Sequence, residues 1–241
     1  ALDAAVGALG GIDAHALIAE ALRRGDELHN RNAAATSLLA ERLAEGMLRA
    51  GVEAEIDFVD EQFRTLRRRR ATRLREDFCG TANTSCEWVR RRTDNTVVGL
   101  DLDEPTLAWG REHHLSRLSP SQQRRVSLLN RNVLAPGPDA SRMDAVLAMN
   151  FSYFCLKTRP LLLKYFRAVN ASLVRDGVFF MDYAGGWECM KDHQEIRPCG
   201  GFNYIWRARN FDPITHDIKC SISFTFPDGS RLPNAFTYDW R

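Results

Sequence analysis

Polar and small residues at the ends of two predicted strands are the part of this chain best suited to chemistry. The first strand leads into E-D-F-C-G-T-A at residues 76–82, and the second, V-V-G-L-D, ends at Asp101. Gly80 lets the backbone turn sharply and approach a ligand, because no Cβ stands in the way. The carboxylate of Asp101 can accept both hydroxyls of a ribose, and the 21 residues from Gly80 to Asp101 suffice for one helix and a returning strand. The pattern predicts a nucleoside-binding βαβ unit.

The composition of the turn separates two classes of ligand. A dinucleotide enzyme needs G-x-G-x-x-G for the pyrophosphate, and here Phe78, Gly80 and Asn83 stand at the corresponding positions. A single glycine suits a diphosphate poorly. A ligand without phosphates, such as S-adenosylmethionine, tolerates this turn better, and Glu76 on the preceding strand can help to bind its ammonium group.

The E-D-F-C-G-T-A turn and the G-L-D-L-D strand end resemble motifs I and II of class I S-adenosylmethionine-dependent methyltransferases, and the resemblance extends from about residue 53 onward. That family usually has glycine at the positions of Phe78 and Ala82. The resemblance implies that Asp101 holds the ribose hydroxyls and that Leu102 and Val133 sandwich the adenine. The implied cofactor-binding residues are Glu76, Phe78, Cys79, Gly80, Thr81, Asp101, Leu102, Asn132, Val133 and Asn150.

Asn132 has two interpretations. It can contact the edge of the adenine, although aspartate is more common at its place in the family pattern. It can equally be a turn residue that bonds its own backbone.

Methyl transfer from a sulfonium needs alignment of the nucleophile, methyl group and sulfur, together with the exclusion of water. A general base is needed only where the acceptor is protonated at neutral pH. Tyr153, after the fourth predicted strand, and Asp182 and Tyr183, at the end of the fifth, are the catalytic candidates. We therefore expect in-line methyl transfer to a small-molecule acceptor.

Arginine runs support an alternative from another class of function. The net charge of +2 gives no global field that favours nucleic acid, but Arg67–Arg70, Arg73 and Arg75 form one run and Arg90–Arg92 another. A charged run is more often a solvated face than an RNA-binding patch. The alternative is thus a non-catalytic or RNA-associated scaffold with a methyltransferase fold, and nucleic acid is an unlikely partner that the sequence does not exclude.

The order of elements predicts an α/β fold with a Rossmann-like parallel sheet. A helical segment over 1–52 precedes a cofactor-binding core over 53–184, and an antiparallel β insertion over 185–241 follows the fifth strand. Strands are expected at 72–78, 96–102, 126–129, 145–148 and 178–183, with helices before 67 and at 84 onward, 104–118 and 160–173.

The C-terminal region combines alternating patterns with many aromatic residues. Alternation predicts antiparallel strands at 202–208, 218–226 and 235–240, and His193 is expected in the loop before them. Such an insertion often forms a substrate lid in this class, and its aromatic residues can equally be the core of the small sheet. A parallel sheet that ends with the apolar fifth strand leaves one side of that strand unpaired, and native proteins cover such edges. We therefore expect either that the chain continues past Arg241 or that these antiparallel strands fold back over the fifth strand.

The cysteines, the histidines and the lengths of the apolar runs bear on metal binding and membrane insertion. The six cysteines show no metal spacing with the six histidines and indicate reduced thiols in the cytoplasm, and no apolar run is long enough to span a membrane. No metal site is expected, since His113 and His114 are adjacent and cannot share a helix face. The segment G-D-E-L-H-N-R-N-A-A-A-T-S at 25–37 resembles part of a bacterial family associated with carbamoyl transfer.

Overall fold

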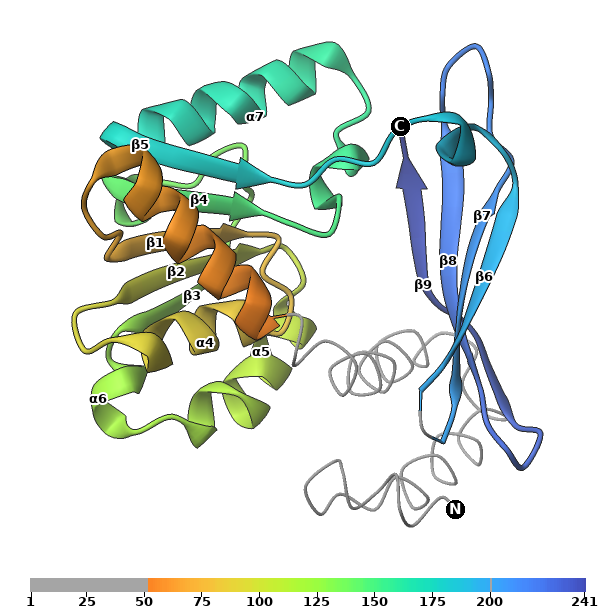
Figure 1. Ribbon diagram of the computed structural model, residues 1–241, viewed down its shortest axis with the longest axis horizontal. Helices are drawn as coiled ribbons and strands as arrows, with labels where there is room; N and C mark the ends of the chain where they lie inside the picture. The colour runs from red at the N-terminus through yellow and green to blue at the C-terminus, as the bar shows by residue number, and fades with distance from the viewer. Residues whose placement is uncertain (1–51, 200) are drawn as a thin grey trace. The chain divides into compact units, whose positions relative to one another are not determined.

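The computed structural model describes residues 52–199 and 201–241 of the chain (Figure 1). They fall into two compact units, which divide between Ala184 and Gly185. No helix within these described ranges is both long and apolar enough to cross a membrane. The predicted helical segment over 1–52 lies almost wholly outside the described residues.

The first unit contains a five-stranded parallel sheet in the order β3-β2-β1-β4-β5. Its strands are β1 (Arg73–Asp77), β2 (Thr96–Asp101), β3 (Val126–Asn130), β4 (Met143–Ala148) and β5 (Leu173–Met181). Every residue of β4 is buried, as expected for a parallel strand that is covered on both faces. The predicted Rossmann-like sheet is confirmed.

Helices precede and connect these strands near the predicted positions, except that α5 ends five residues earlier than predicted and α6 was not predicted. They are a helix at residues 52–67, α4 (Asn83–Arg91), α5 (Glu104–His113), the short α6 (Pro120–Gln123) and α7 (Arg159–Ser172), with 3-10 turns at Leu115–Arg117, Pro138–Ala140 and Ser152–Cys155. Asp103 caps α5 by accepting from the Thr106 amide, and Thr158 caps α7 by accepting from the Leu161 amide. These caps fix where the helices begin, which sets the length of the loops at the strand ends.

A hydrophobic core covers each face of the parallel sheet. On one face Ile56, Val59 and Phe63 of the helix at 52–67 pack with Trp88 of α4. On the other face α7 supplies Tyr165 and Val169. Figure 1 shows the helix at 52–67 lying across the sheet, with all five strands pointing towards the same edge.

Two details of the first unit differ from the predictions. The fifth strand was predicted to begin at residue 178, but β5 also includes residues 173–177, where the pairing with β4 is irregular. Arg75 was assigned to a solvated charge run, but its side chain is fully buried. Because side chains alternate along a strand, Arg75 and Asp77 point to the α7 face while Leu74 and Glu76 point to the opposite one.

The second unit is a four-stranded antiparallel sheet in the order β6-β7-β8-β9. Its strands are β6 (His193–Pro198), β7 (Asn203–Arg209), β8 (Ile218–Thr225) and β9 (Arg231–Trp240), and the 3-10 turn Trp187–Met190 precedes them. The antiparallel insertion is confirmed. The placement of His193 in a loop was wrong, since it begins β6.

Among the described residues, the outer strand β5 of the parallel sheet is paired on one side only. β5 pairs with β4, whereas β6 to β9 pair with one another in their own sheet. The strands at 202–240 therefore do not pair with β5, as the second of the two expected alternatives would have required. Phe180 of β5 instead packs edge-to-face with Phe58 of the helix at 52–67, and Phe179 packs with Tyr165 of α7.

Candidate functional site

The order of the parallel sheet places a candidate site at the carboxyl ends of β1 and β4. The connections run outwards in opposite directions from these two neighbouring strands, and ligands of open α/β sheets bind at such a switch point. The register brings Glu76 of β1 beside Leu147 of β4, and Asp77 beside Leu100 of β2. The turns after β1, β2 and β4 consequently meet at one edge.

The turn after β1 has the backbone conformation of a glycine-rich turn. Phe78, Gly80 and Ala82 have φ values of 58°, 52° and 62°, all in the left-handed region that favours glycine. Phe78 and Ala82 are the two positions where the family pattern has glycine. The sequence departs from that pattern while the backbone keeps its shape, at an expected strain of roughly 1–2 kcal/mol for each non-glycine residue.

Asp101 holds this turn from the end of β2. One carboxylate oxygen accepts from the Gly80 amide at 2.8 Å, and the other accepts from the Asp103 amide at 2.9 Å. The backbone amide of Cys79 donates to the Leu100 carbonyl at 3.0 Å. Asp101 is partly exposed, and each carboxylate oxygen has a further lone pair for a ligand.

The two sides of the turn differ in the space that they leave. A Cβ built on Gly80 would meet nothing within 4 Å, so this side is open to a ligand. A Cβ built on Gly110 of α5 would lie 2.4 Å from the Thr81 carbonyl oxygen. Gly110 therefore lets α5 pack directly against the backbone of the turn.

The side chain of Cys79 points away from the open side. Cys79 is 6% exposed and packs with Ala82 and Leu107. Burial raises the pKa of its thiol well above the ordinary value. Cys79 thus contributes backbone to the turn and an inert thiol to the core.

Carboxylates gather on one side of this edge. Glu76 accepts from the amide of Ser85 at 2.8 Å and from its hydroxyl at 2.5 Å, which caps the start of α4. Burial, partly offset by the hydrogen bonds from Ser85 and reinforced by the nearby carboxylate of Glu55, raises the pKa of Glu76 to about 8. Burial, followed by the charge of Asp182, raises the pKa of Glu55 to about 7. The three carboxylates come from β1, the helix at 52–67 and the segment after β5.

The residues assigned to the adenine are in different environments. Leu102 is 66% exposed after β2, and Val133 is 5% exposed within the core on the α7 face. The Asn132 side-chain oxygen accepts from the Leu134 amide at 2.8 Å, so it makes the predicted turn contact and keeps its NH₂ group as a donor. Asn130 donates to the Leu102 carbonyl at 2.9 Å, which orders the loop that carries Leu102.

The turn after β4 lies against the end of β5. Asn150 and Phe151 have φ values of 59° and 56°, so they form a second group of left-handed residues at the switch point. Asp182 accepts from the Phe151 amide at 2.9 Å through its side chain and from the Tyr153 hydroxyl at 2.8 Å through its carbonyl. Tyr183 is 79% exposed. Strained backbone of this kind is frequent where a fold positions groups for function.

The three catalytic candidates differ in what their side chains can do. Tyr153 is 5% exposed, its hydroxyl is already used as a donor, and burial raises its pKa to about 12. Such a hydroxyl positions the β5 end and is poorly suited to accept a proton. Asp182 and the exposed Tyr183 remain the better candidates, and Phe154 lies between Tyr153 and Tyr183 in edge-to-face contacts.

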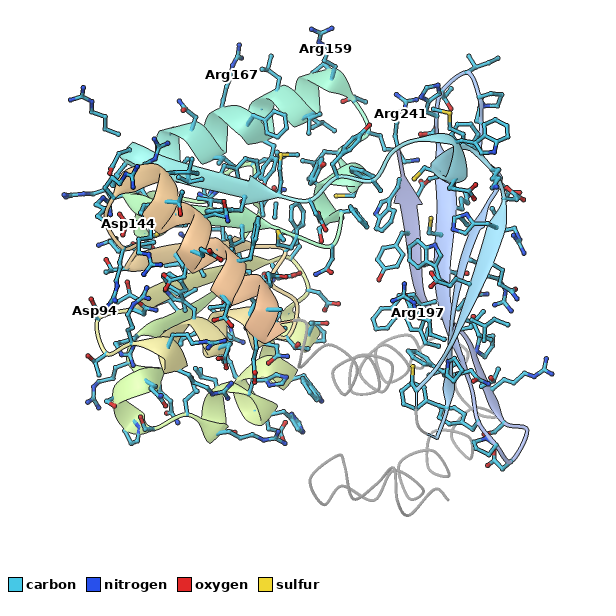
Figure 2. The ribbon with its side chains drawn as sticks, in the orientation of Figure 1. Asp94, Asp144, Arg159, Arg167, Arg197 and Arg241 are labelled. Atoms are coloured by element: carbon cyan, nitrogen blue, oxygen red, sulfur yellow. The ribbon has the colours of Figure 1, made fainter. Side chains whose placement is uncertain are left out.

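A buried ion pair lies beneath the β1 turn on the α7 face. Arg75 and Asp77 are 0% and 2% exposed, and their side chains approach to 2.9 Å. The Tyr165 hydroxyl donates to Asp77 at 2.8 Å, and Arg75 donates to the Ala140 carbonyl at 3.2 Å. Figure 2 shows how densely side chains fill this unit. The group fixes the strand that immediately precedes the turn.

Two residues of the site were not predicted from the sequence. Glu55 gave no signal, because only the tertiary packing of the helix at 52–67 brings it near Asp182. Gly110 was recognisable as a glycine inside a helix, which commonly marks a close packing contact. Within the part of the chain that the structure describes, no group of His, Cys, Asp and Glu side chains is arranged to hold a metal ion.

Several solved methyltransferases have a fold similar to that of this chain. An S-adenosylmethionine-dependent methyltransferase from Clostridium acetobutylicum is 19% identical with a TM-score of 0.61, over 81% of this chain and 76% of that chain. The S-adenosylmethionine-bound CalS10 of Micromonospora echinaspora, an amino pentose methyltransferase, is 18% identical with a TM-score of 0.58, over 78% of this chain and 75% of that chain. The chain has the fold of the class I S-adenosylmethionine-dependent methyltransferases.

The N-terminal part of the sequence is similar to a different group of proteins. A family model described as oxamate carbamoyltransferase subunit AllG matches residues 1–98. The uncharacterized protein YahG of Escherichia coli is 47% identical over 47 residues, which are 20% of this chain and 10% of that protein. The described part of the matched stretch forms the helix at 52–67, β1, α4 and the first half of β2.

Proposed function

We propose that the protein transfers a methyl group from S-adenosylmethionine to a small-molecule acceptor. The observation that carries the proposal is the turn after β1, in which Phe78, Gly80 and Ala82 keep the glycine conformation and Asp101 anchors the Gly80 amide. A ligand approaching this turn meets bare backbone at Gly80 and a carboxylate at the adjoining strand end. That pairing suits an uncharged nucleoside edge better than a diphosphate.

The described residues fit S-adenosylmethionine, which supplies a methyl group on a positively charged sulfur. Asp101 would accept the ribose hydroxyls through its remaining lone pairs, and the exposed side chain of Leu102 would cover the adenine. The NH₂ group of Asn132 is free to face the adenine edge. Gly80 would leave space for the chain that joins the ribose to the sulfur.

The charge of the site supports a cationic ligand. Glu55, Glu76 and Asp182 place three carboxylates close together, and burial and mutual repulsion raise the pKa of Glu55 to about 7 and that of Glu76 to about 8. A sulfonium and an ammonium group relieve this repulsion by ion pairing. Loss of a proton from Glu76 is therefore expected when the cofactor binds.

The same charge favours an amine as the acceptor. CalS10 acts on an amino pentose, and a protonated amine would be attracted to Glu55 and Asp182. An amine must lose its proton before it attacks, and a carboxylate that titrates near neutral pH can accept that proton. Asp182 and Tyr183, at the end of β5, would align the acceptor for in-line attack.

Calorimetric titration with S-adenosylhomocysteine tests cofactor binding. Asp101→Asn is expected to weaken binding by about 10- to 100-fold, the scale of one or two charge-assisted hydrogen bonds. Asp103→Asn is the matched control, because it removes a neighbouring negative charge and keeps the cap of α5. Equal effects of the two variants, or no binding by the wild type at millimolar ligand, would contradict the proposal.

Transfer of a labelled methyl group tests the acceptor. The enzyme is incubated with labelled S-adenosylmethionine and paired acceptors, an amino sugar and the same sugar with a hydroxyl group in place of the amine. Label is expected in the amino sugar alone. Label in the hydroxyl compound alone would refute the amine and leave methyl transfer intact.

A further inference from the structure

The edge of the parallel sheet opposite the candidate site carries a concentrated positive charge. Three segments meet there, at residues 67–73, 141–144 and 174–177. Hydrogen bonds hold them together, because Asp144 accepts from the amides of Thr72 and Arg73 at 2.8 and 3.0 Å. Figure 2 shows Asp144 at the edge where the strands begin.

Both carboxylates of these segments are already paired with one arginine. Arg69 donates to both oxygens of Asp176 at 2.7 and 2.9 Å, and it approaches Asp144 to 2.8 Å. The Arg69 side chain is 38% exposed, and Asp144 is 9% exposed. Arg69 thus pairs with both of the acidic side chains that the three segments contain.

The remaining arginines of the three segments form an exposed set, which we call the arginine surface. Its members are Arg67, Arg68, Arg70, Arg73, Arg142 and Arg175. Arg67 and Arg73 donate to the carbonyls of Gly177 and Ser141 at 3.4 and 3.3 Å, which are neutral acceptors. Seven arginines against two aspartates leave an excess of five positive charges in a chain whose net charge is +2.

The composition of the arginine surface favours phosphate groups. Guanidinium groups stay charged at every relevant pH and match phosphate oxygens in a bidentate fork. The three segments contain no aromatic residue, so they lack both the stacking platform of a base-reading site and the aromatic core of a protein interface. We propose that this edge binds the phosphate backbone of a nucleic acid without reading its sequence, at a site separate from the methyl-transfer site.

Binding of a fluorescent single-stranded RNA 20-mer, measured by polarisation with the full chain, tests the proposal. Neutralising about four phosphates predicts a slope near −3 for the logarithm of affinity against the logarithm of salt. Raising NaCl from about 50 to about 200 mM should therefore weaken binding about 50-fold. No binding at low salt, or a flat salt dependence, would overturn the proposal.

A quadruple variant identifies the surface. It combines Arg68→Asn and Arg142→Asn, because both residues have φ of 59° and asparagine tolerates that conformation, with Arg70→Ser and Arg175→Ser. The matched control removes the same charge elsewhere, at Arg117, Arg159, Arg167 and Arg231, all exposed and each changed to serine.

The two variants and two competitors give distinct outcomes. The surface variant should lose at least about 30-fold in RNA affinity and the control less than about 3-fold, as expected when four phosphate contacts are removed from one and none from the other. Equal losses, or preferential binding of polyglutamate or of anionic phospholipid vesicles over RNA, would refute the nucleic-acid assignment. Titration of both variants with S-adenosylhomocysteine separates this result from the fate of the proposed methyl transfer, and it also reports whether the variants fold.

Discussion

Replacing Glu76 with glutamine is the most direct test of the electrostatics at the candidate site. Glu76 accepts two hydrogen bonds from Ser85, and a glutamine side-chain oxygen can accept both in the same geometry. The substitution therefore removes the titration of the carboxyl group and keeps the cap of α4. Any effect that depends on pH then reports the carboxyl group alone.

The sign follows from the direction of the pKa shift. Burial raises the pKa of Glu76 from 4.5 to about 8, so the folded state binds the proton more tightly than the unfolded chain does. The stability from this group is fully present below pH 4.5 and is lost as pH rises through 8. Between pH 5 and pH 9 the wild type should lose up to ~4 kcal/mol of stability relative to Glu76→Gln.

Denaturant unfolding of both proteins at intervals from pH 5 to pH 9 measures this difference. Amide hydrogen exchange of the peptide that spans β1 and the start of α4 provides a local readout, because the Ser85 amide loses its acceptor when this region opens. Glu61→Gln is the matched control, because it makes the same substitution at an exposed glutamate of the helix at 52–67.

The expected result is a pair of curves that diverge as pH rises, with the variant more stable at alkaline pH. Parallel curves would show that Glu76 titrates as an ordinary exposed carboxyl group, which would refute the buried carboxylate cluster. Divergence in the opposite direction would mean that the helix N-terminus stabilises the ionised form more than burial destabilises it.

Three further substitutions test the framework of the site. Gly80→Val should abolish S-adenosylhomocysteine binding in calorimetry with a modest loss of stability, because the side chain would enter the open side of a turn with φ of 52°; normal binding would make this turn purely structural. Gly110→Ala should lower both the melting temperature and the affinity, since its Cβ would lie 2.4 Å from the Thr81 carbonyl; an unchanged melting temperature would contradict that contact. Asp77→Asn should cost about 3–5 kcal/mol of unfolding free energy, because it leaves Arg75 charged and unpaired in the core, and the double substitution Arg75→Met with Asp77→Leu should cost less; a larger cost for the double variant would refute this account.

The sequence predicts β2, β3 and β4 well because each of these strands is a short, largely apolar run followed by polar residues. The A-V-L-A of β4 and the V-V-G-L of β2 lie between helices with clear start signals, such as Asp103 before Pro105. β6 (His193–Pro198) escaped prediction for the opposite reason. Its one large apolar residue, Ile196, is 54% exposed, so the strand has no buried face to leave an alternating pattern.

The buried charges show where sequence reasoning fails within a well-predicted strand. Arg75 continues a visible run of arginines, and composition alone favours a solvated position for it. Its burial depends on Asp77, two residues later on the same strand face, and on Tyr165 of α7, which bonds to Asp77 from 88 residues further along the chain. Only the packing of α7 against the sheet supplies that contact. Glu55 is similar, since its neighbours Thr84 and Asp182 lie in other elements.

The turn after β1 shows that a motif can persist in backbone shape after its residues have changed. Glycine is common in such turns because it adopts positive φ without strain, yet Phe78 and Ala82 adopt that conformation here. Each is held by packing, with Phe78 against Tyr165 at 6.0 Å between ring centroids and Ala82 fully buried beside Leu107. The core contacts of these side chains offset the backbone strain. Gly80 alone faces the open side of the turn, where a side chain would stand in the space available to a ligand. One glycine is therefore enough to keep this side of the turn open.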